Sequence, residues 1–302
     1  MPVVVRAPAK INLHLGVGPR RDDGYHELVT VFQAVDLLDE VVADHPAEPA
    51  DATNVTATVT GEGADDVPAG EGNLAVRAAR LLAERTGTTT GVHLSIRKAI
   101  PVAGGMAGGS ADAAAALVAC DALWGTALDR SDLEVLAAEL GSDVPFSLVG
   151  GTALGTGRGV HLSPVLTRGS YAWVLALAHG GLSTPEVFTA YDAEERLTWS
   201  ARADAVLAAL RAGDPVALGA ALTNDLQDAA ARLRPDLRRT LEAAADLGAL
   251  GAVVSGSGPT VALLAADADA ATDLAAGLTG LGVCRTVRRA DGPVPGARVV
   301  DR

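Results

Sequence analysis

Short apolar runs, separated by charged or glycine-rich segments, divide the first third of the chain. Their lengths and their content of Val, Ile and Leu are typical of β-strands. The strands predicted in this way are Val3–Val5, Ile11–Val17, Leu28–Val35, Val55–Val59 and Val92–Ile96.

Three segments between residues 73 and 141 carry a helical pattern instead. In Asn73–Glu84 apolar residues recur at i, i+4, i+7 and i+8 from Leu74, which makes one apolar stripe. The Ala-rich segment from Ser110 to about Trp124 predicts a second helix. The sequence Ser131-Asp132-Leu133-Glu134 has the form of a capping box that opens a third helix, and Gly141 closes it.

The pattern of predicted strands and helices changes beyond about Ser163. The predicted strands there are Tyr171–Ala178, Val253–Ser255, Thr260–Leu264 and Val283–Val287. The predicted helices are Pro185–Tyr191, Ala201–Leu210, Pro235–Leu247 and Ala268–Leu278. Strands and helices mix without a regular βαβα rhythm, which favours an α+β fold with two layers in each half. Domains usually have about 100–200 residues, so the sequence predicts two, residues 1–163 and 164–302.

Composition and charge narrow the classes of partner. Hydrophobic residues make up 49% of the chain and charged residues 20%, an ordinary globular balance. The formal net charge of −13 repels polyanions, so we expect no nucleic-acid partner. An anionic small substrate is not excluded, because a few backbone amides and one or two lysines make a locally positive pocket.

Cysteine usage and hydropathy indicate the compartment. Cys120 and Cys284 show no metal-ligand spacing, so we expect two free thiols and a reducing cytoplasm. Polar residues interrupt the apolar stretch near the N-terminus, so we expect no signal peptide. The longest uncharged run, Leu247–Ala266, contains a Gly-Pro turn and reads as strand–turn–strand, so we expect no membrane segment.

The segment from Pro101 to Ser110 is a glycine-rich loop between a predicted strand and a predicted helix. Glycines let a ligand approach the backbone, and the free N–H groups of the first helical turn favour an anion such as a nucleotide phosphate. Ser110 could cap the helix, contact a phosphate oxygen or approach Mg²⁺. The alternative is a flexible turn that only feeds the helix. Gly109 is followed by Ser110 and not by Lys, and the G-x-G-x-x-G pattern is missing, which excludes the P-loop and the dinucleotide fingerprint.

The loop resembles the phosphate loop of the GHMP kinases, and two further motifs agree. They are Ala7-Pro8-Ala9-Lys10-Ile11-Asn12-Leu13 near the start and Ser255-Gly256-Ser257-Gly258-Pro259-Thr260 near the end. The resemblance implies a ribosomal protein S5 domain 2-like N-terminal domain, a ferredoxin-like C-terminal domain and a site in the cleft between them. It also implies ATP as the phosphoryl donor, with Mg²⁺ carried by the ATP.

Two other segments indicate which branch of the superfamily is involved. They are Arg21–Leu28, with its Gly-Tyr-His sequence, and Gly141–Phe146. They resemble the branch that phosphorylates the 2-hydroxyl of a cytidine diphosphate conjugate in non-mevalonate isoprenoid synthesis. The alternatives are another GHMP small-molecule kinase, homoserine kinase being the nearest, and a regulator that binds nucleotide without catalysis. The oligomeric state is not predicted.

The resemblance implies that Asp143 takes the proton from the substrate hydroxyl and that Lys10 sits beside it. A lysine there would hold the carboxylate in place and stabilise charge on the transferring group. From the pattern alone, the commoner role of Asp143 would be to cap a short helix ahead of Pro145, and Lys10 would usually lie on the exposed face of its strand.

The remaining assignments also come from the resemblance. The expected nucleotide-binding residues are Asn73, Lys98, Pro101, Gly104, Gly105, Met106, Ala107, Gly108, Gly109, Ser110 and Ala111. The expected substrate-binding residues are Asn12, Tyr25, His26 and Asp143, with Tyr25 and His26 on the cytosine. Asn73 is also the obvious N-cap of its helix, and Tyr25 could merely anchor a hairpin. Many relatives have a second Ser at the position of Ala111, so only Ser110 can supply that hydroxyl. We expect no metal site built by the protein alone.

Overall fold

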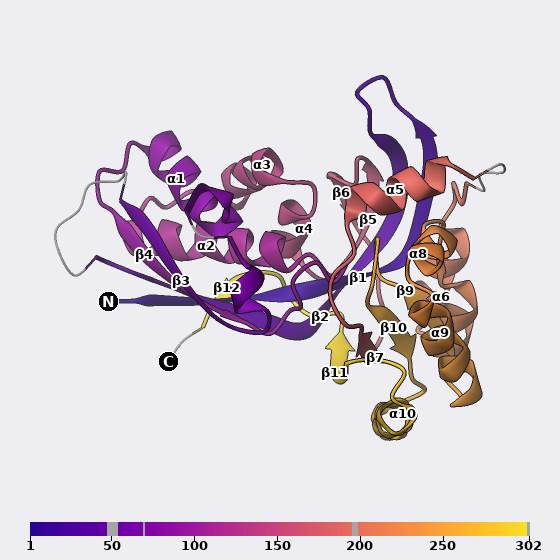
Figure 1. Ribbon diagram of the computed structural model, residues 1–302. Coiled ribbons are helices and arrows are strands. Elements are labelled where there is room, and N and C mark those ends of the chain that lie inside the picture. The colour runs from indigo at the N-terminus through magenta and orange to yellow at the C-terminus, as the bar shows by residue number, and fades with distance from the viewer. Residues whose placement is uncertain (47–53, 69, 195–198, 301–302) are drawn as a thin grey trace.

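A long antiparallel hairpin forms the centre of the first sheet. The computed structural model describes residues 1–46, 54–68, 70–194 and 199–300. Strands β1 (Val3–Arg20) and β2 (His26–Asp44) pair from Val3 opposite Ala43 to Arg20 opposite His26, with three register shifts on the way. Each is much longer than the short runs predicted, because polar residues such as Lys10 and Asn12 lie inside the strands and are themselves buried. The hairpin tip extends beyond the rest of the sheet (Figure 1).

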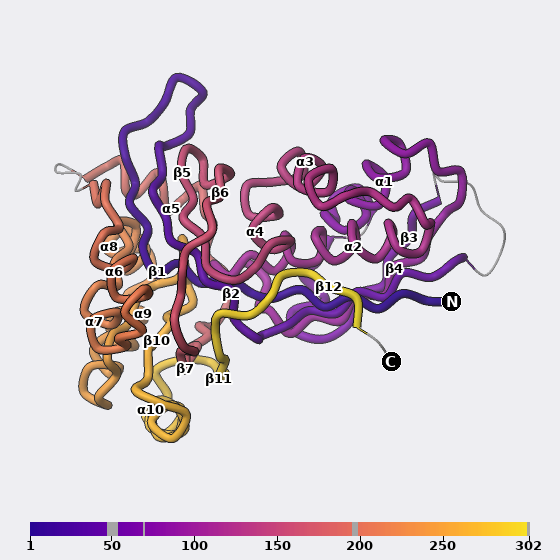
Figure 2. Tube along the Cα trace, turned by 180° about the vertical axis from the view of Figure 1, so that it is seen from behind, coloured from indigo at the N-terminus to yellow at the C-terminus, as the bar shows by residue number. Residues whose placement is uncertain are grey.

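The first sheet has the order β12-β1-β2-β4-β3, with β5 and β6 continuing from β2 and β8 pairing with β1. Its other strands are β3 (Val55–Gly61), β4 (Val92–Lys98), β5 (Thr152–Gly157), β6 (His161–Pro164), β8 (Thr223–Asn224) and β12 (Arg298–Val299). Two short 3₁₀ helices, Ala64–Asp66 and Gly70–Gly72, follow β3. Although β8 and β12 come late in the chain, both pair with β1, and the last residues run along the first sheet (Figure 2).

Four helices cover one face of this sheet (Figure 1). They are α1 (Leu74–Thr86), α2 (Gly108–Trp124), α3 (Arg130–Leu140) and α4 (Val144–Val149). Helix α2 is the innermost, and nearly all of its alanines are fully buried. A helix that is apolar on all sides is buried on all sides. Its small side chains let α2 pack closely against both β1 and β2.

The second sheet is antiparallel, in the order β11-β7-β10-β9. Its strands are β7 (Tyr171–Leu177), β9 (Gly251–Val254), β10 (Val261–Leu264) and β11 (Thr286–Gly292). The helices of this half are α5 (Thr184–Asp192), α6 (Asp204–Ala212), α7 (Pro215–Ala221), α8 (Gln227–Leu233), α9 (Asp236–Asp246) and α10 (Ala268–Leu281). Helix α5 lies beside the tip of the β1–β2 hairpin in both views (Figures 1 and 2).

Two local predictions were wrong. Helix α3 begins at Arg130, and its cap is Asp129, which accepts a hydrogen bond from Asp132 N at 2.9 Å. Ser131 is therefore inside the helix, and the predicted capping box does not form; the predicted end at Gly141 is confirmed. Cys284 is free, as Cys120 is, but it lies between α10 and β11 and not in a strand.

The α+β prediction is confirmed by two sheets that each pack against helices. The boundary between residues 163 and 164 stays a prediction. Within the described residues, no helix is long and apolar enough to cross a bilayer.

Candidate active site

A cavity of about 470 Å³ opens between the helical layer and the second half of the chain. Segments far apart in sequence line it: β1, β2, the glycine loop with the start of α2, the start of α4, and the turn after β9. The predicted site residues that line it are Lys10, Asn12, Asn73, Lys98, Pro101, Gly104, Gly105, Ala107, Gly108, Gly109, Ser110 and Asp143. Met106 and Ala111 are fully buried, and Tyr25 and His26 do not line the cavity.

The glycine loop presents an uncapped helix end to the cavity. Ala107 is the N-cap residue of α2 in a left-handed conformation and provides no side-chain hydrogen bond to the first turn. Gly108, Gly109 and Ser110 form that turn and line the cavity. Since a helix N-terminus with free N–H groups attracts anions, this end suits a phosphate group.

The turn after β9 holds the loop in place from the second half of the chain. Ser255 Oγ donates to the carbonyl of Gly105 at 3.0 Å, and Thr260 N donates to the carbonyl of Gly104 at 3.3 Å. Gly105 has φ of +77°, and a Cβ built there would lie 2.1 Å from the carbonyl oxygen of Ser255. The third sequence motif thus has a structural role, because only glycine fits where the two turns meet.

Lys10 and Asp143 meet in the cavity from different elements. Lys10 Nζ lies 3.9 Å from Asp143 Oδ2, and the Lys10 side chain is 7% exposed while that of Asp143 is 31% exposed. The alternative of a surface lysine is therefore wrong. Asp143 occupies the N-cap position of α4, but its side chain makes no cap hydrogen bond. Burial lowers the pKa of Lys10, and the charge of Asp143 offsets part of this effect.

Thr30, which the sequence analysis missed, fixes the orientation of Asn12. Its hydroxyl donates to the carbonyl of His14 at 2.8 Å and so can only accept from Asn12 Nδ2, also at 2.8 Å. Asn12 Oδ1 must then face Lys10, whose Nζ donates to it at 2.7 Å. Thr30 is fully buried and lines the cavity. A polar residue inside the apolar run Leu28–Val35, which also contains Gln33, was the available signal.

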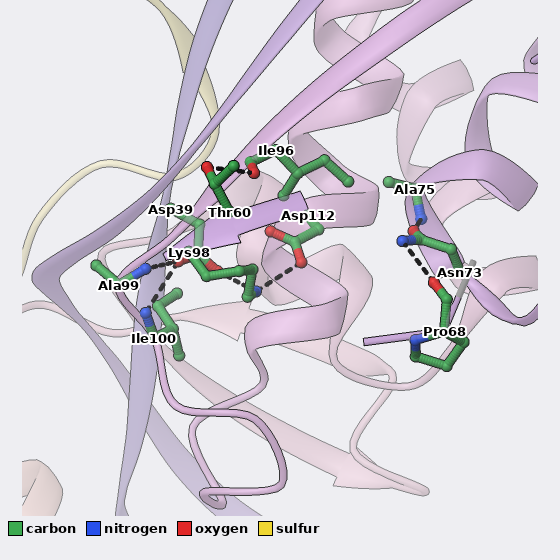
Figure 3. Close-up of polar contacts among 10 residues, drawn as sticks. All are labelled: Asp39, Thr60, Pro68, Asn73, Ala75, Ile96, Lys98, Ala99, Ile100 and Asp112. Atoms are coloured by element: carbon green, nitrogen blue, oxygen red, sulfur yellow. Dashed lines mark hydrogen bonds and ion pairs between the residues drawn. The ribbon is translucent and has the colours of Figure 1, made fainter. Parts of the chain in front are cut away.

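Lys98 is held between two buried carboxylates (Figure 3). Its Nζ donates to Asp39 Oδ2, and to Asp112 Oδ2 at 2.6 Å. Asp39 Oδ1 accepts from the backbone N of Ala99 and of Ile100, at 2.6 and 2.9 Å. The cluster therefore joins the end of β4 to the N-terminal part of α2, one on each side of the glycine loop. Lys98 lines the cavity, but its charge is already balanced within the protein.

The pKa values in this cluster follow from its burial. Burial alone would lower the pKa of Lys98, but Asp112 and Asp39 more than offset this effect and raise it. Burial raises the pKa of Asp112 to about 7, although Lys98 opposes the shift. Asp112 Oδ1 is buried without a hydrogen-bond partner among the described residues. Asp39 and Asp112 were both missed; the available signal was an acid in the first part of the Ala-rich helix.

Asn73 is the N-cap of α1, which was the second of the two roles that the sequence predicted for it. Its Oδ1 accepts from Ala75 N at 2.9 Å, and its Nδ2 donates to the carbonyl of Pro68 at 3.2 Å (Figure 3). Because Asn73 also lines the cavity, the cap does not exclude the predicted contact with a nucleotide.

Tyr25 and His26 point in different directions. His26 is buried, with Nδ1 2.9 Å from the carbonyl of Gly18 and Nε2 3.2 Å from Asp192 Oδ1. Its ring lies 5.2 Å from that of Phe188, which does line the cavity. Tyr25 is half exposed. The sequence analysis did not single out Phe188, because its place beside His26 depends on how α5 packs against the hairpin.

Comparisons with known proteins agree with this geometry. Residues 73–151 match the GHMP kinases N terminal domain and residues 206–283 the GHMP kinases C terminal domain. The 4-diphosphocytidyl-2-C-methyl-D-erythritol kinase of Mycolicibacterium gilvum (strain PYR-GCK) is 58% identical over 99% of this chain and 92% of its own. That of Thermobifida fusca (strain YX) is also 58% identical, over 99% and 98%. The chain belongs to the 4-diphosphocytidyl-2-C-methyl-D-erythritol kinase family of GHMP kinases.

Solved structures place this GHMP kinase in the same fold. A crystal structure of 4-(cytidine 5'-diphospho)-2C-methyl-D-erythritol kinase matches with a TM-score of 0.76 and 34% identity, over 96% of this chain and 98% of the other. A homoserine kinase from Cytophaga hutchinsonii has a TM-score of 0.79 at 21% identity, over 99% and 97%. At that identity the second match shows the shared fold alone. The two-domain GHMP kinase fold predicted from the motifs is confirmed.

The matched domains contain most of the cavity wall. The N-terminal match includes Asn73, Lys98, the glycine loop and Asp143, and the C-terminal match includes the turn that holds the loop. Lys10 and Asn12 lie outside both, on β1. Thr30, Arg158 and Phe188, which also line the cavity, lie outside both matches as well, so this GHMP kinase completes its candidate site with segments beyond the two matched ranges.

Proposed function

We propose that this GHMP kinase transfers the γ-phosphoryl group of ATP to the 2-hydroxyl of 4-diphosphocytidyl-2-C-methyl-D-erythritol, a step in non-mevalonate isoprenoid precursor synthesis. The observation that carries the proposal is the pairing of Lys10 with Asp143 in the cavity that the uncapped end of α2 faces. Identities of 56–58% over 99% of the chain, to relatives that bear this kinase's name, support the choice of substrate.

The nucleotide phosphates would bind at the first turn of α2. Gly108 leaves little room for a side chain in that turn, since a Cβ at this position would lie 3.2 Å from Lys98 Nζ and 3.1 Å from Ile100. The adenosine would extend toward Asn73 and Pro68, which line the same side of the cavity.

Mg²⁺ carried with ATP fits this wall without a protein cage. No group of three potential ligands from His, Cys, Asp and Glu occurs in the part of the chain that the structure describes. Mg²⁺ commonly keeps several waters and binds through substrate phosphates. The side-chain oxygen best placed to join them is the hydroxyl of Ser110, because Asp112 is occupied by Lys98. Bound there, the ion would neutralise charge on the phosphates.

Asp143 would accept the proton of the attacking hydroxyl. Its carboxylate is reachable from the cavity, whereas Lys10 is buried and fixed by Asn12. A positive charge held beside the base stabilises the charge that develops on the alkoxide and on the transferring phosphoryl group. Positioning dominates phosphoryl transfer, so the rigid hydrogen-bond chain through Asn12 and Thr30 is part of the machinery.

The cytidine would bind at the hairpin end of the cavity. Phe188 offers an aromatic face at the cavity wall, and His26 lies behind it, 5.2 Å away. We propose that the base stacks against Phe188 and that His26 and Tyr25 complete the pocket. Both cysteines are free, which suits a reducing compartment, and we propose that the enzyme acts in the cytoplasm.

A panel of phosphoryl acceptors tests the proposal. Purified protein with Mg²⁺ and ATP is assayed against the cytidine conjugate, its uridine analogue, free methylerythritol phosphate, homoserine and mevalonate. We expect turnover of the cytidine conjugate, with the new phosphate on the 2-hydroxyl by ³¹P NMR. Preferred use of homoserine would favour the first alternative. ATP binding without turnover of any acceptor would favour a regulator.

A further inference from the structure

Three cationic side chains line the cavity, and two of them already have acidic partners. Lys98 contacts Asp39 and Asp112, and Lys10 lies 3.9 Å from Asp143. Among the described residues, the structure shows no carboxylate within 4.0 Å of the third, Arg158, so its charge is not balanced locally. In a chain of net charge −13, an unpaired cation at a binding cavity favours an anionic ligand.

The turn that carries Arg158 is held rigidly while its side chain is left exposed. Gly157 and Gly159 flank it with φ of +68° and +86°, and Gly159 N donates to the carbonyl of Thr156 at 3.1 Å. Gly157 N donates to Glu27 Oε1 at 3.1 Å, which ties the β5–β6 turn to β2 at the base of the hairpin tip. The backbone thus fixes where Arg158 enters the cavity wall.

The Tyr25 ring orients the guanidinium group. The Cζ atom of Arg158 lies 3.6 Å from the centroid of the ring. A cation placed over an aromatic ring uses the face of the guanidinium plane and leaves its N–H donors at the edge free. Those donors can form two parallel hydrogen bonds to phosphate oxygens, a planar fork that a lysine does not have.

We propose that Arg158 binds the diphosphate of the cytidine conjugate and that Tyr25 positions its guanidinium group. The inference rests on the proposed substrate and adds the residue that recognises its diphosphate. Phe188 and Arg158 lie on the wall of the same cavity as the Lys10–Asp143 pair. The diphosphate of the conjugate joins the base to the reacting end, so one cation between them would align the whole substrate. Since Arg158 covers one face of Tyr25, a base could stack only on the other.

Binding of cytidine, CMP and CDP to the full-length enzyme tests this assignment by calorimetry. Arg158→Met should weaken CDP binding by roughly 10–100-fold, as expected for loss of charged hydrogen bonds, and leave cytidine binding unchanged. Arg158→Lys should recover only part of the affinity, because it keeps the charge without the paired donors. The matched control is Arg211→Met, an exposed arginine in the last turn of α6, which should bind all three ligands as wild type does.

Tyr25→Leu and the double variant separate positioning from packing. If Tyr25 acts through Arg158, Tyr25→Leu should weaken CDP binding more than cytidine binding, and it should do so less in the Arg158→Met background. An unchanged ratio of CDP to cytidine affinity in Arg158→Met, in an enzyme that turns over the conjugate, overturns the inference and leaves the proposed function intact. A wild-type enzyme that does not turn over the conjugate overturns both.

Discussion

The ammonium of Lys10 and the carboxylate of Asp143 lie 3.9 Å apart, and only the carboxylate is substantially exposed to the cavity. Lys10 projects from the middle of β1 and is buried, while Asp143 stands at the start of α4. In the proposed function this arrangement separates two tasks: the buried cation is fixed, and the reachable carboxylate would act as the base toward the substrate. It also makes the contributions of the two residues experimentally distinguishable.

Asp143→Asn should preserve the fold and lower kcat by about 10²–10⁴-fold, the usual contribution of a general base. The amide keeps the shape of the side chain, and its position at the start of α4 carries no cap hydrogen bond to lose. Steady-state kinetics and a melting curve check this together. An Asn variant with near-wild-type kcat would show that the carboxylate takes no proton.

Thr30→Val should lower kcat while leaving the KM for ATP nearly unchanged, and Thr30→Ser should restore it. Without the hydroxyl, Asn12 is free to turn its amide nitrogen toward Lys10, which disfavours the charged lysine. Burial already lowers the pKa of Lys10, so the alkaline limb of the kcat profile should move to still lower pH. A profile with an unmoved alkaline limb in Thr30→Val would mean that Thr30 only fills space.

Gly105→Ala should weaken ATP binding and lower the melting temperature. The substitution costs about 1–2 kcal/mol for the left-handed backbone, and its Cβ would lie 2.1 Å from the carbonyl oxygen of Ser255, which blocks docking of the loop. Gly280→Ala is the matched control, because nothing lies within 4 Å of a Cβ there and Gly280 lies inside α10. That control should be slightly more stable than wild type. Equal ATP affinity in Gly105→Ala and wild type would contradict a role for the docked loop.

Asp112→Asn should flatten the dependence of stability on pH. The pKa of Asp112 is raised from 3.8 to about 7 in the folded protein, so the folded state holds a proton that the unfolded chain has lost between these values. The resulting stabilisation is fully present below about pH 4 and is lost as pH rises through about 7. Denaturant unfolding at pH 5 and pH 8 should therefore show that the free energy of unfolding falls less for the Asn variant than for wild type as the pH rises. Equal changes in the free energy of unfolding of both proteins between pH 5 and pH 8 would show that the pKa of Asp112 is not raised.

Lys98→Met tests the same cluster from its centre. Removing the cation leaves Asp39 and Asp112 buried without a counter-charge, and breaking a buried ion pair on one side costs about 3–5 kcal/mol. Because the cluster joins the elements on each side of the glycine loop, ATP affinity should fall as well. The double variant with Asp112→Asn should recover part of the stability. No recovery would mean that Asp112 carries no charge in the native protein.

Phe188→Ala should weaken binding of the cytidine conjugate by roughly 5–150-fold. Base stacking contributes about 1–3 kcal/mol, and each tenfold change in affinity corresponds to about 1.36 kcal/mol. ATP affinity should not change. His26→Ala should relax the preference for the cytidine conjugate over its uridine analogue. Both are read from kcat/KM for the two conjugates. If Phe188→Ala kept the wild-type kcat/KM, the cytosine base would not bind at this end of the cavity.

Local sequence was sufficient wherever the chemistry is local. The glycine loop and α2 were predictable because the glycines and a following Ala-rich segment lie next to one another in the chain. The cap at Asn73 was predictable for the same reason. That α2 begins at Gly108, so that Ser110 lies inside its first turn and does not cap it, came from the structure. The start of α3 was not, because Asp129 and Ser131 are both good cap residues and the choice between them depends on the entering backbone.

The sequence by itself determined the fold class, the glycine-rich loop ahead of α2 and the residues that stand in the family's motifs. Only the tertiary structure decided what those residues touch. It placed Asp39 and Asp112 around Lys98, turned Asn12 toward Lys10 through Thr30, and set Arg158 on the ring of Tyr25. The physical reason is that the protonation or orientation of a buried charge or amide depends on its hydrogen-bond and charge partners. Strand pairing and helix packing bring those partners together, and the spacing of residues along the chain specifies neither the pairing nor the packing.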